Sequence, residues 1–579
     1  MRLGRLSAVV AVAAVTLGVV SVPTATAGGP SGRFDRPRSG FAPASTVLRA
    51  GSPESVGLDP AALLVAEQRI DAWTRPGASG HPLLSGAVGV HIHDGVVVNT
   101  HVVGGAVRYA DGSGTELPPE RQVPMREDTI FDMASVSKLF TSIVVLQLVE
   151  RGKVRLDKPV RDYLPEFGVN GKEPITVQQL LTHTSGLEPF LYLWRDWPDK
   201  AARIKAVMDV KPKYVPGSTY EYSDLNLITL GVLAERLTGS PLDVLVRTGI
   251  TEPLRMSDTG YNPPEEKLPR VAATEFMTVP DRGMVRGQVH DENAWSLGGV
   301  AGHAGVFSTA ADMSVLGQAV LNGGSYRGAR ILRPDTVRKM LTNYNQAFPG
   351  DSHGLGFELD QLWYMGGLTS PDSAGHTGYT GTSLVIDPKS RSIAILLTNR
   401  VHPSRNWGTI QPAREVWANG LARALAVRPA RGHDAWFSEI GNLSAATLTS
   451  GPLATGGRSA RVEFAAFADS EPTDTLVLES SPDGVAWQPV PLRASGRGAP
   501  DGEVTALSGT GHRAWWRVRA ELPATERLYV RWRYATDRLY TGRGMIVDAI
   551  KIREGRNTLL DSERDPEALR AEGWRLRSR

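Results

Sequence analysis

Apolar and polar residues alternate in several short stretches of the chain, and such alternation predicts half-buried β-strands. Residues 88–92 alternate up to an Asp94-Gly95 turn, and a second apolar stretch begins at Val96. This pattern predicts a β-hairpin, because Asp-Gly suits a tight two-residue turn. Residues 383–387 and 392–397 predict a second hairpin in the same way.

Helical spacing of apolar residues is found on both sides of these hairpins. Asp59-Pro60 predicts the start of a helix. Its apolar face is formed by Leu63, Ala66, Ile70 and Trp73. Another helix is predicted near residues 412–426, and residues 145–321 are mostly helix and loop. We therefore predict an α+β fold, in which an antiparallel sheet is flanked by terminal helices, a helical subdomain is inserted, and a functional site lies in the cleft between them.

Strand patterns dominate after a linker at residues 427–433, which contains Pro, Arg and Gly. The predicted strands are residues 460–467, 475–479, 513–520, 528–534 and 545–552, with a turn at Asp483-Gly484. They predict a β-sandwich over residues 434–579. Few contacts should cross such a linker, so we expect the sandwich to be an accessory domain that is separable from catalysis.

Residues 1–27 have the pattern of a secretory signal peptide. A start that contains arginine precedes an apolar run at residues 6–22, and Ala25-Thr26-Ala27 is a small-residue cleavage site. We expect a secreted protein without a membrane span, with a flexible leader at residues 28–48. The alternative is an uncleaved membrane anchor, since the run is just short of spanning length.

Composition narrows the possible functions. The 579 residues are 41% hydrophobic and 22% charged, which is ordinary for globular proteins and more than one typical domain needs. The formal net charge of +3 is spread over 64 basic and 61 acidic residues without a long basic run, so nothing indicates nucleic-acid binding. The chain has no cysteine. Disulfides, cysteine nucleophiles, thiolate metal sites and a lipidated cysteine are therefore excluded.

The run Ser135-Val136-Ser137-Lys138 carries the strongest chemical signal. A Ser-x-x-Lys spacing places a nucleophile and a base one turn apart on the same face of a helix. An apolar helix follows at residues 139–148, so Ser135 should lie at a helix start, where free backbone N–H groups favour developing negative charge. Lys138 can accept the serine proton if burial and nearby positive charge hold its amine neutral. The spacing alone is weak evidence, because a solvated lysine on a helix would also produce it.

Two later stretches complete the pattern. Tyr222 and Asp224 lie on a turn that leads into an apolar helix. The run His376-Thr377-Gly378-Tyr379 lies in a Gly-rich stretch that enters a strand, and glycines there let a substrate approach the backbone closely.

Together the three motifs resemble those of the serine β-lactamase and penicillin-binding-protein superfamily, in particular its class C-like branch with esterases and D-aminopeptidases. Ser135 and Lys138 match its nucleophile and lysine. Tyr222 and Asp224 match the Tyr-x-Asn element, and His376-Thr377-Gly378 matches the Lys/His-Thr-Gly strand. Each motif alone is only a hypothesis, so their joint order carries the resemblance.

The resemblance covers roughly residues 50–425, and the runs at residues 180–187 and 298–309 also look like this branch. It implies a β-lactamase/transpeptidase-like serine hydrolase domain at residues 49–427. Residues 540–548 resemble the jelly-roll modules that are appended to secreted bacterial hydrolases.

Two departures from the usual family pattern bear on the substrate. His376 stands where lysine is usual, and Asp224 stands where asparagine is usual. Both changes disfavour a carboxylate-bearing β-lactam or D-Ala-D-Ala end, because a fixed cation is lost and an acid is added. The resemblance implies that His-Thr-Gly versions are common among esterases and aminopeptidases.

We therefore expect a secreted serine hydrolase that acts through an acyl-serine on small esters, amides or D-amino-acid peptides, without a metal or cofactor. The predicted catalytic residues are Ser135, Lys138, Tyr222 and His376. The predicted substrate and oxyanion contacts are Asp224, Thr377, Gly378 and Tyr379. Lys138 and Tyr222 should share the proton transfers, and the backbone N–H groups of Ser135 and Tyr379 should hold the oxyanion. The alternatives are a D,D-carboxypeptidase or β-lactamase, and a non-catalytic relative that binds cell-wall peptides or glycans.

Other histidines and tryptophans have ordinary explanations. His91 and His93 fit same-face positions on a strand better than a metal pair. Structural hydrogen bonding is the expected role of His183, His303 and residues 290–293. A sandwich core is the expected place of Trp515, Trp516 and Trp532. Contact of the C-terminal domain with cell walls or glycans is left open.

Overall fold

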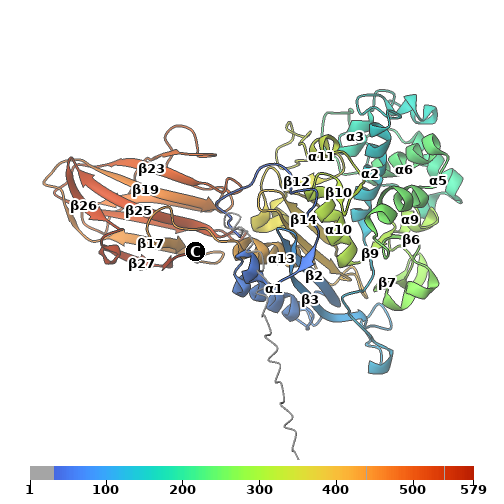
Figure 1. Ribbon diagram of the computed structural model, residues 1–579, viewed down its shortest axis with the longest axis horizontal. Helices are drawn as coiled ribbons and strands as arrows, with labels where there is room; N and C mark the ends of the chain where they lie inside the picture. The colour runs from blue at the N-terminus through green and yellow to red at the C-terminus, as the bar shows by residue number, and fades with distance from the viewer. Residues whose placement is uncertain (1–31, 439, 540–541) are drawn as a thin grey trace, which may run out of the picture.

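An eight-stranded sheet is the framework of the first part of the computed structural model, which describes residues 32–438, 440–539 and 542–579 (Figure 1). Its strands run in the order β1-β3-β2-β15-β14-β13-β12, and β4 pairs with β3. Their bounds are β1 (Arg49–Ala50), β2 (Gly86–His93), β3 (Val96–Val107), β4 (Val123–Pro124), β12 (Glu358–Leu359), β13 (Ala374–Thr377), β14 (Ser383–Asp387) and β15 (Ser392–Thr398). The two predicted hairpins are β2–β3 and β14–β15, both antiparallel, while the short β1 pairs in parallel with β3.

Helices cover both faces of this sheet. The predicted terminal helices, α1 (Pro60–Trp73) and α13 (Gln411–Ala424), pack together on one face. α1 is capped by the Asp59 carboxylate, which accepts the Ala61 N–H. Gly89 lets Trp417 of α13 lie against β2, because a Cβ at that position would be 2.3 Å from the indole ring. On the opposite face lies α10 (Ala310–Leu321).

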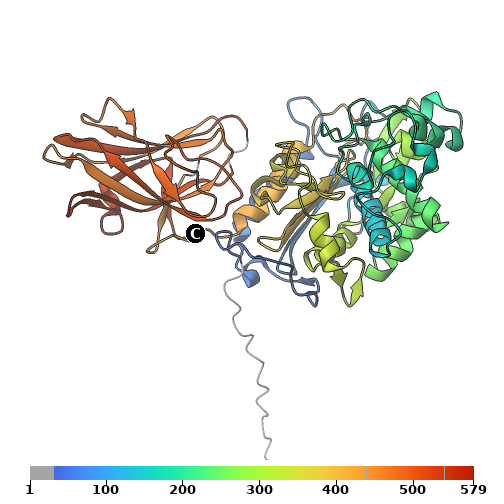
Figure 2. The same ribbon diagram turned by 90° about the horizontal axis from the view of Figure 1, so that it is seen from above.

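The helical subdomain lies on the side of the sheet that is farther from the C-terminal strands (Figures 1 and 2). Its main helices are α2 (Ser137–Glu150), α3 (Val177–Leu181), α5 (Lys200–Asp209), α6 (Asp224–Thr238) and α9 (Glu292–Ser296). A small sheet in the order β5-β9-β6 joins β5 (Phe131–Asp132), β9 (Val306–Ser308) and β6 (Gly260–Tyr261). α2 is almost entirely buried and packs against α6, because its residues are apolar on every side. The predicted α+β fold is confirmed.

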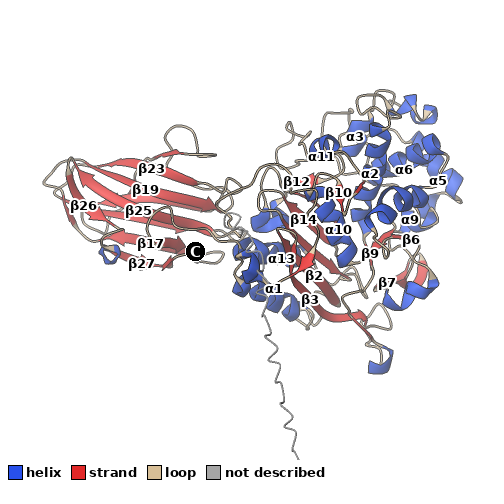
Figure 3. Cartoon of the chain, viewed as in Figure 1, coloured by secondary structure: helices blue, strands red, loops and turns tan. Residues whose placement is uncertain are grey.

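The C-terminal part consists almost entirely of strands (Figure 3). One sheet has the order β22-β23-β19-β25-β16-β28 with β26 on β25, and the other has the order β21-β20-β24-β17-β27 with β18 on β24. The predicted strands are β19 (Ala460–Asp469), β20 (Thr475–Ser481), β23 (Trp515–Leu522), β24 (Arg527–Ala535) and β25 (Gly544–Glu554). The sequence pattern missed β16 (Ala435–Ser438), β17 (Ala445–Ser450), β18 (Leu453–Ala454), β21 (Gln488–Pro489), β22 (Arg493–Ser495), β26 (Asn557–Asp561), β27 (Leu569–Glu572) and β28 (Trp574–Arg577). Most of these are too short to show a clear alternation.

The two parts share a hydrophobic cluster, so the expectation that few contacts cross the linker is wrong. The cluster joins Leu368, Trp417, Phe437, Phe467 and Ile546. Arg513 of the sandwich forms an ion pair of 2.6 Å with Asp387 at the end of β14, and both side chains are fully buried. Arg513 also donates to the Leu368 carbonyl at 2.8 Å. Linker composition could not reveal these contacts, because they join residues that are far apart in the sequence.

Residues 32–48 contradict the predicted flexible leader. Phe34 is only 1% exposed, and the guanidinium groups of Arg513 and Arg543 lie 4.4 Å and 4.3 Å from its ring centre. One buried aromatic side chain thus fixes a segment whose composition suggests disorder. The predicted signal peptide lies within residues 1–31, outside the described residues. Among the described helices, none is both long and apolar enough to cross a bilayer.

His91 and His93 have separate hydrogen-bond partners. Nε2 of His91 hydrogen-bonds the Trp417 carbonyl at 2.9 Å, and its ring stacks on that indole at 4.0 Å. Nδ1 of His93 hydrogen-bonds the Ser392 hydroxyl at 2.9 Å, and its Nε2 accepts the Gly32 N–H at 2.9 Å. Both are structural, as expected for residues on a buried strand.

Trp516 and Trp532 lie in the sandwich core, as predicted. Trp515 is half-buried beside the interface between the two parts, where Nε1 donates to the Arg428 carbonyl at 3.1 Å and the ring packs edge-on to Phe467. Burial prevents Trp516 and Trp532 from stacking on sugars. Glycan contact through another surface of the sandwich stays a prediction.

Buried histidines should make the fold sensitive to mild acid. Burial lowers the pKa of His91 and His376 to about 3 and that of His93, His353 and His402 to about 4. In the unfolded chain a histidine has a pKa of about 6.5. The unfolded state therefore binds more protons below pH ~6.5, and stability is lost as pH falls toward the folded pKa values. Each such histidine should contribute about 1.4 kcal/mol per pH unit.

Urea unfolding between pH 7 and pH 5 measures this slope. His91→Phe keeps the stacking on Trp417 but removes one titrating group. Between pH 7 and pH 5 we expect its loss of stability to be smaller by about 2 kcal/mol, because titration with an unfolded pKa near 6.5 is only partial at the upper end of this range. An unchanged slope in this variant would contradict the assignment of acid sensitivity to buried neutral histidines.

Candidate active site

A backbone turn before α2 fixes the position of Ser135. The 3-10 turn Ala134–Val136 leads directly into α2, so the serine lies at a helix start, as predicted. Ala134 has a φ of +44°, which is uncommon for a residue with a side chain. The Asp132 carboxylate holds the turn, because Oδ1 accepts the Ala134 N–H at 2.8 Å and Oδ2 accepts the His290 N–H at 2.6 Å. Strained turns of this kind concentrate at functional sites.

Three of the predicted catalytic residues meet at this turn. Nζ of Lys138 donates to Oγ of Ser135 at 2.8 Å and to the His303 carbonyl at 3.3 Å. The same Nζ lies 4.8 Å from the ring centre of Tyr222, so the phenol lies beside the Ser135–Lys138 pair. Lys138 is 1% exposed, whereas Ser135 is partly exposed. A substrate can therefore reach the hydroxyl group while the amine stays shielded from water.

The charge of Lys138 differs from the expectation. Burial alone would lower its pKa, but the ion pair with Asp224 at 2.7 Å and the neighbouring Tyr222 outweigh burial and raise the pKa above its usual range. The condition stated from the sequence, that nearby positive charge holds Lys138 neutral, is not met, because its partner is the acidic residue Asp224. Burial also raises the pKa of Tyr222, although Lys138 opposes this. At neutral pH Lys138 thus rests as an ammonium beside Asp224, and Tyr222 rests as a protonated phenol.

The turn after β13 lies against the turn that carries the serine. Gly378 approaches so closely that a Cβ would be 2.4 Å from the Met133 carbonyl oxygen, so only glycine fits. Thr380 Oγ1 donates to the Asp132 carbonyl at 2.7 Å, and Thr382 Oγ1 donates to the Met133 carbonyl at 3.1 Å. These contacts fix the predicted substrate strand relative to the serine.

His376 on β13 is buried beside Tyr222, with the ring centres 6.2 Å apart. Its Nδ1 donates to the Thr377 carbonyl at 2.8 Å, which leaves Nε2 as an acceptor. Within the described part of the chain, this buried Nε2 has no hydrogen-bond partner. Burial lowers the pKa of His376 to about 3, and the Lys138 ammonium contributes to this effect. The third motif therefore presents a neutral acceptor instead of a cation.

Tyr379 follows on the same turn and has an exposed side chain. Its ring stacks on His290 with the centres 5.8 Å apart, and the Arg405 guanidinium lies 5.6 Å from its centre. The oxyanion role of its backbone N–H stays a prediction.

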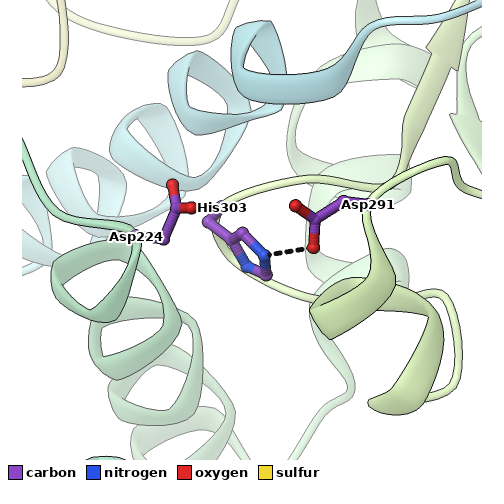
Figure 4. A group of neighbouring side chains, drawn as sticks. All are labelled: Asp224, Asp291 and His303. Atoms are coloured by element: carbon purple, nitrogen blue, oxygen red, sulfur yellow. Dashed lines mark hydrogen bonds and ion pairs between the residues drawn. The ribbon is translucent and has the colours of Figure 1, made fainter. Parts of the chain in front are cut away.

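His303 lies between Asp224 and Asp291 (Figure 4). Its Nε2 is 2.9 Å from Asp291 Oδ1, and a ligand atom of each of the three residues lies within 4.8 Å of the others. Despite burial, His303 holds the pKa of Asp291 well below its usual range. These residue types could bind a metal, but the Lys138 ammonium already occupies one side of Asp224 and would repel a second cation. The group instead supports the loop whose carbonyl accepts from Lys138.

Several supporting residues were not predicted as part of the site. Asn226 on α6 donates to His183 Nδ1 at 3.1 Å, and the His183 ring stacks on Tyr222 at 4.6 Å. Asp132 lies three residues before Ser135, and Thr380 lies two residues after Gly378. This closeness to the motifs was the only feature of the sequence that could have indicated their supporting role. The hydrogen-bonding role expected for His183 is confirmed.

Comparison with known proteins agrees with this arrangement. Residues 70–414 match the Beta-lactamase family model. A "Putative D-alanyl-D-alanine carboxypeptidase" of Salmonella schwarzengrund is 33% identical over 425 residues, which cover 67% of this chain and 93% of that protein, and its counterpart in Salmonella typhi gives the same values. A penicillin-binding protein homologue from Caulobacter crescentus of known structure is 24% identical, with a TM-score of 0.48, over 64% of this chain and 98% of that one. The chain belongs to the β-lactamase family and is a serine hydrolase of the superfamily that also contains the penicillin-binding proteins.

Proposed function

We propose that this serine hydrolase forms an acyl intermediate on Ser135 and acts on small esters, amides or D-amino-acid peptides. The observation that carries the proposal is the 2.8 Å contact between Ser135 Oγ and the buried Lys138 Nζ at the start of α2. A serine needs a neighbouring proton acceptor to become nucleophilic, and this contact supplies the path for the proton. A protein that only binds ligands has no need for the arrangement.

The ion pair suggests how a protonated lysine serves as the base. As Ser135 Oγ bonds to the substrate carbonyl carbon, its proton passes to Lys138 Nζ, which gives one of its own protons to Asp224 Oδ1 at 2.7 Å. The leaving group then takes a proton through Tyr222, whose ring lies beside Lys138 Nζ. Water releases the acyl group by the reverse proton path. Asp224 is thus the final proton acceptor in this proposal.

The charges of the site bear on the choice of substrate. A free substrate carboxylate would meet the neutral His376 and the carboxylate of Asp224. Substrates without a free carboxylate beside the scissile bond therefore fit better. The names of the curated relatives support D,D-carboxypeptidase activity as a second candidate. Secretion and a cell-wall location remain part of the proposal.

Kinetics with four probes test this ranking. We expect kcat/KM for p-nitrophenyl acetate and D-alanine p-nitroanilide to exceed that for a D-Ala-D-Ala peptide and for nitrocefin, by roughly tenfold or more, because a missing cation costs at least one charged hydrogen bond. A D-Ala-D-Ala peptide as the best substrate would support the second candidate. A kcat/KM for nitrocefin far above the values for the other three substrates would favour a β-lactamase.

A further inference from the structure

Three acidic side chains converge in the sandwich, far from the serine. Glu471 and Asp474 lie on the turn between β19 and β20, and Asp537 follows β24. One carboxylate oxygen of each lies within 4.8 Å of the other two. Asp474 is fully buried, Glu471 is 7% exposed, and Asp537 is partly buried. Such close carboxylates repel one another unless a cation or a proton lies between them.

The protein cations that the structure describes form no ion pair with the group, although Arg538 acts on Asp537 electrostatically. Among the described residues, no lysine, arginine or histidine forms an ion pair with any of the three acids. Oε1 of Glu471 is buried and has no hydrogen-bond partner in the described part of the chain. A buried carboxylate oxygen without a donor is costly, so it needs a ligand that is still to be identified.

Backbone hydrogen bonds hold the group in place. Asp474 Oδ1 accepts the Asp537 N–H at 2.8 Å, and Asp537 Oδ1 accepts the Leu539 N–H at 2.6 Å. Ser470 Oγ donates to the Asp474 carbonyl at 3.2 Å, which closes the turn. The two loops are therefore positioned before any ligand arrives, as a cation site requires.

We propose that Glu471, Asp474 and Asp537 bind a calcium ion. All three offer oxygen ligands, which suit hard cations and disfavour zinc and copper. Mg²⁺ demands near-ideal octahedral geometry and keeps its water molecules, whereas Ca²⁺ accepts an irregular set of protein carboxylates. The other acidic cluster, Asp224 with Asp291 and His303 near the serine, is less suited to a cation, because Lys138 already supplies a positive charge beside Asp224.

The position of the group indicates what the ion would do. Asp469, which precedes the turn that carries Glu471, pairs with Arg543 at 3.3 Å, and the Arg543 guanidinium lies 4.3 Å from the Phe34 ring at the interface. Ca²⁺ between the two sandwich loops would therefore hold a turn that adjoins the interface of the two domains. The ion would stabilise the sandwich and its attachment to α13 without taking part in ester hydrolysis.

Calcium titration of the chelator-treated full-length protein tests the site. We expect a binding heat and a rise in Tm of about 2 °C when Ca²⁺ exceeds its Kd about 100-fold, because the 579 residues unfold with a large entropy. Hydrolysis of p-nitrophenyl acetate at low temperature should not change. An equal response to Mg²⁺ would contradict the assignment to calcium, and no binding heat with no rise in Tm would overturn the site.

Two variants separate a specific site from general salt effects. Glu471→Gln removes one charge at nearly constant shape, so without calcium its Tm should equal or exceed that of the unaltered protein, while its response to Ca²⁺ is lost. Asp501→Asn is the matched control, because Asp501 is an exposed acid elsewhere on the sandwich, and it should keep the full response. A full calcium response in Glu471→Gln would show that this group shares a proton and does not bind an ion.

Discussion

Replacement of Ser135 by alanine should reduce kcat for every substrate by roughly 10⁴-fold or more, because the group that forms the acyl bond is lost. Lys138→Met should cost a similar factor, since no other amine contacts the serine hydroxyl among the described residues. The effects should not add in the double variant, as expected for residues that act as one unit. The measurements are steady-state kinetics and labelling with a fluorophosphonate, which Ser135→Ala should abolish.

Matched controls make this result specific. Ser142 lies further along α2, and its buried hydroxyl group has no hydrogen-bond partner within the described part of the chain, so Ser142→Ala should retain activity and labelling. Lys153 lies just beyond the same helix and is exposed, so Lys153→Met should also leave activity and labelling unchanged. The Tm of each variant shows whether it is folded. Full activity in a folded Ser135→Ala would refute an acyl-serine mechanism.

The sequence predicted the parts of the site that depend on short spacing. Ser135 and Lys138 are three residues apart on a helix, so their contact follows from helical geometry. The β14–β15 hairpin could be predicted because residues 383–387 and 392–397 have a clear strand pattern, but β13, which carries His376, shows no alternation of its own. Local periodicity therefore predicted the neighbouring strands, and the Gly-rich motif alone indicated the position of His376.

The electrostatics of the site could not be predicted in this way. Lys138 and Asp224 are 86 positions apart in the numbering, and only the packing of α2 against α6 makes them an ion pair. Burial of Lys138 could be expected from the apolar helix around it, but its acidic partner could not, so the charge of the lysine was left conditional. The contact between Asp291 and His303 likewise joins two separate loops, and no spacing rule links them.

The association of the two domains was missed for the same reason. A linker composition indicates where few contacts are expected, but it contains no information about surfaces that meet in space. Phe34, Asp387 and Arg513 come from three distant parts of the chain and meet at one interface. Burial of an aromatic ring between guanidinium groups has no local sequence signature.

Loss of the buried ion pair at this interface should strongly destabilise the protein. Arg513→Ala leaves Asp387 buried without its cationic partner, which typically costs about 3–5 kcal/mol in the free energy of unfolding. The matched control is Arg493→Ala, because Arg493 pairs with Glu503 on the surface, with side chains 60% and 52% exposed, and such pairs are worth less than about 1 kcal/mol. Urea unfolding of the full-length protein compares the two variants.

The same interface changes what truncation should do. A chain that ends at Arg428 loses the cationic partner of Asp387 and exposes Phe34, Leu368 and the neighbouring apolar surface. We therefore expect it to be unstable and to aggregate, although every residue of the proposed catalytic group is retained, because exposed apolar patches of this kind promote association. A soluble truncated protein with the Tm and esterase activity of the full chain would show that the sandwich is a separable domain after all, and Arg513→Ala should then have little effect on hydrolysis. If the truncated protein aggregates, and Arg513→Ala is destabilised far more than Arg493→Ala, the two domains fold as one unit around Phe34 and the buried ion pair.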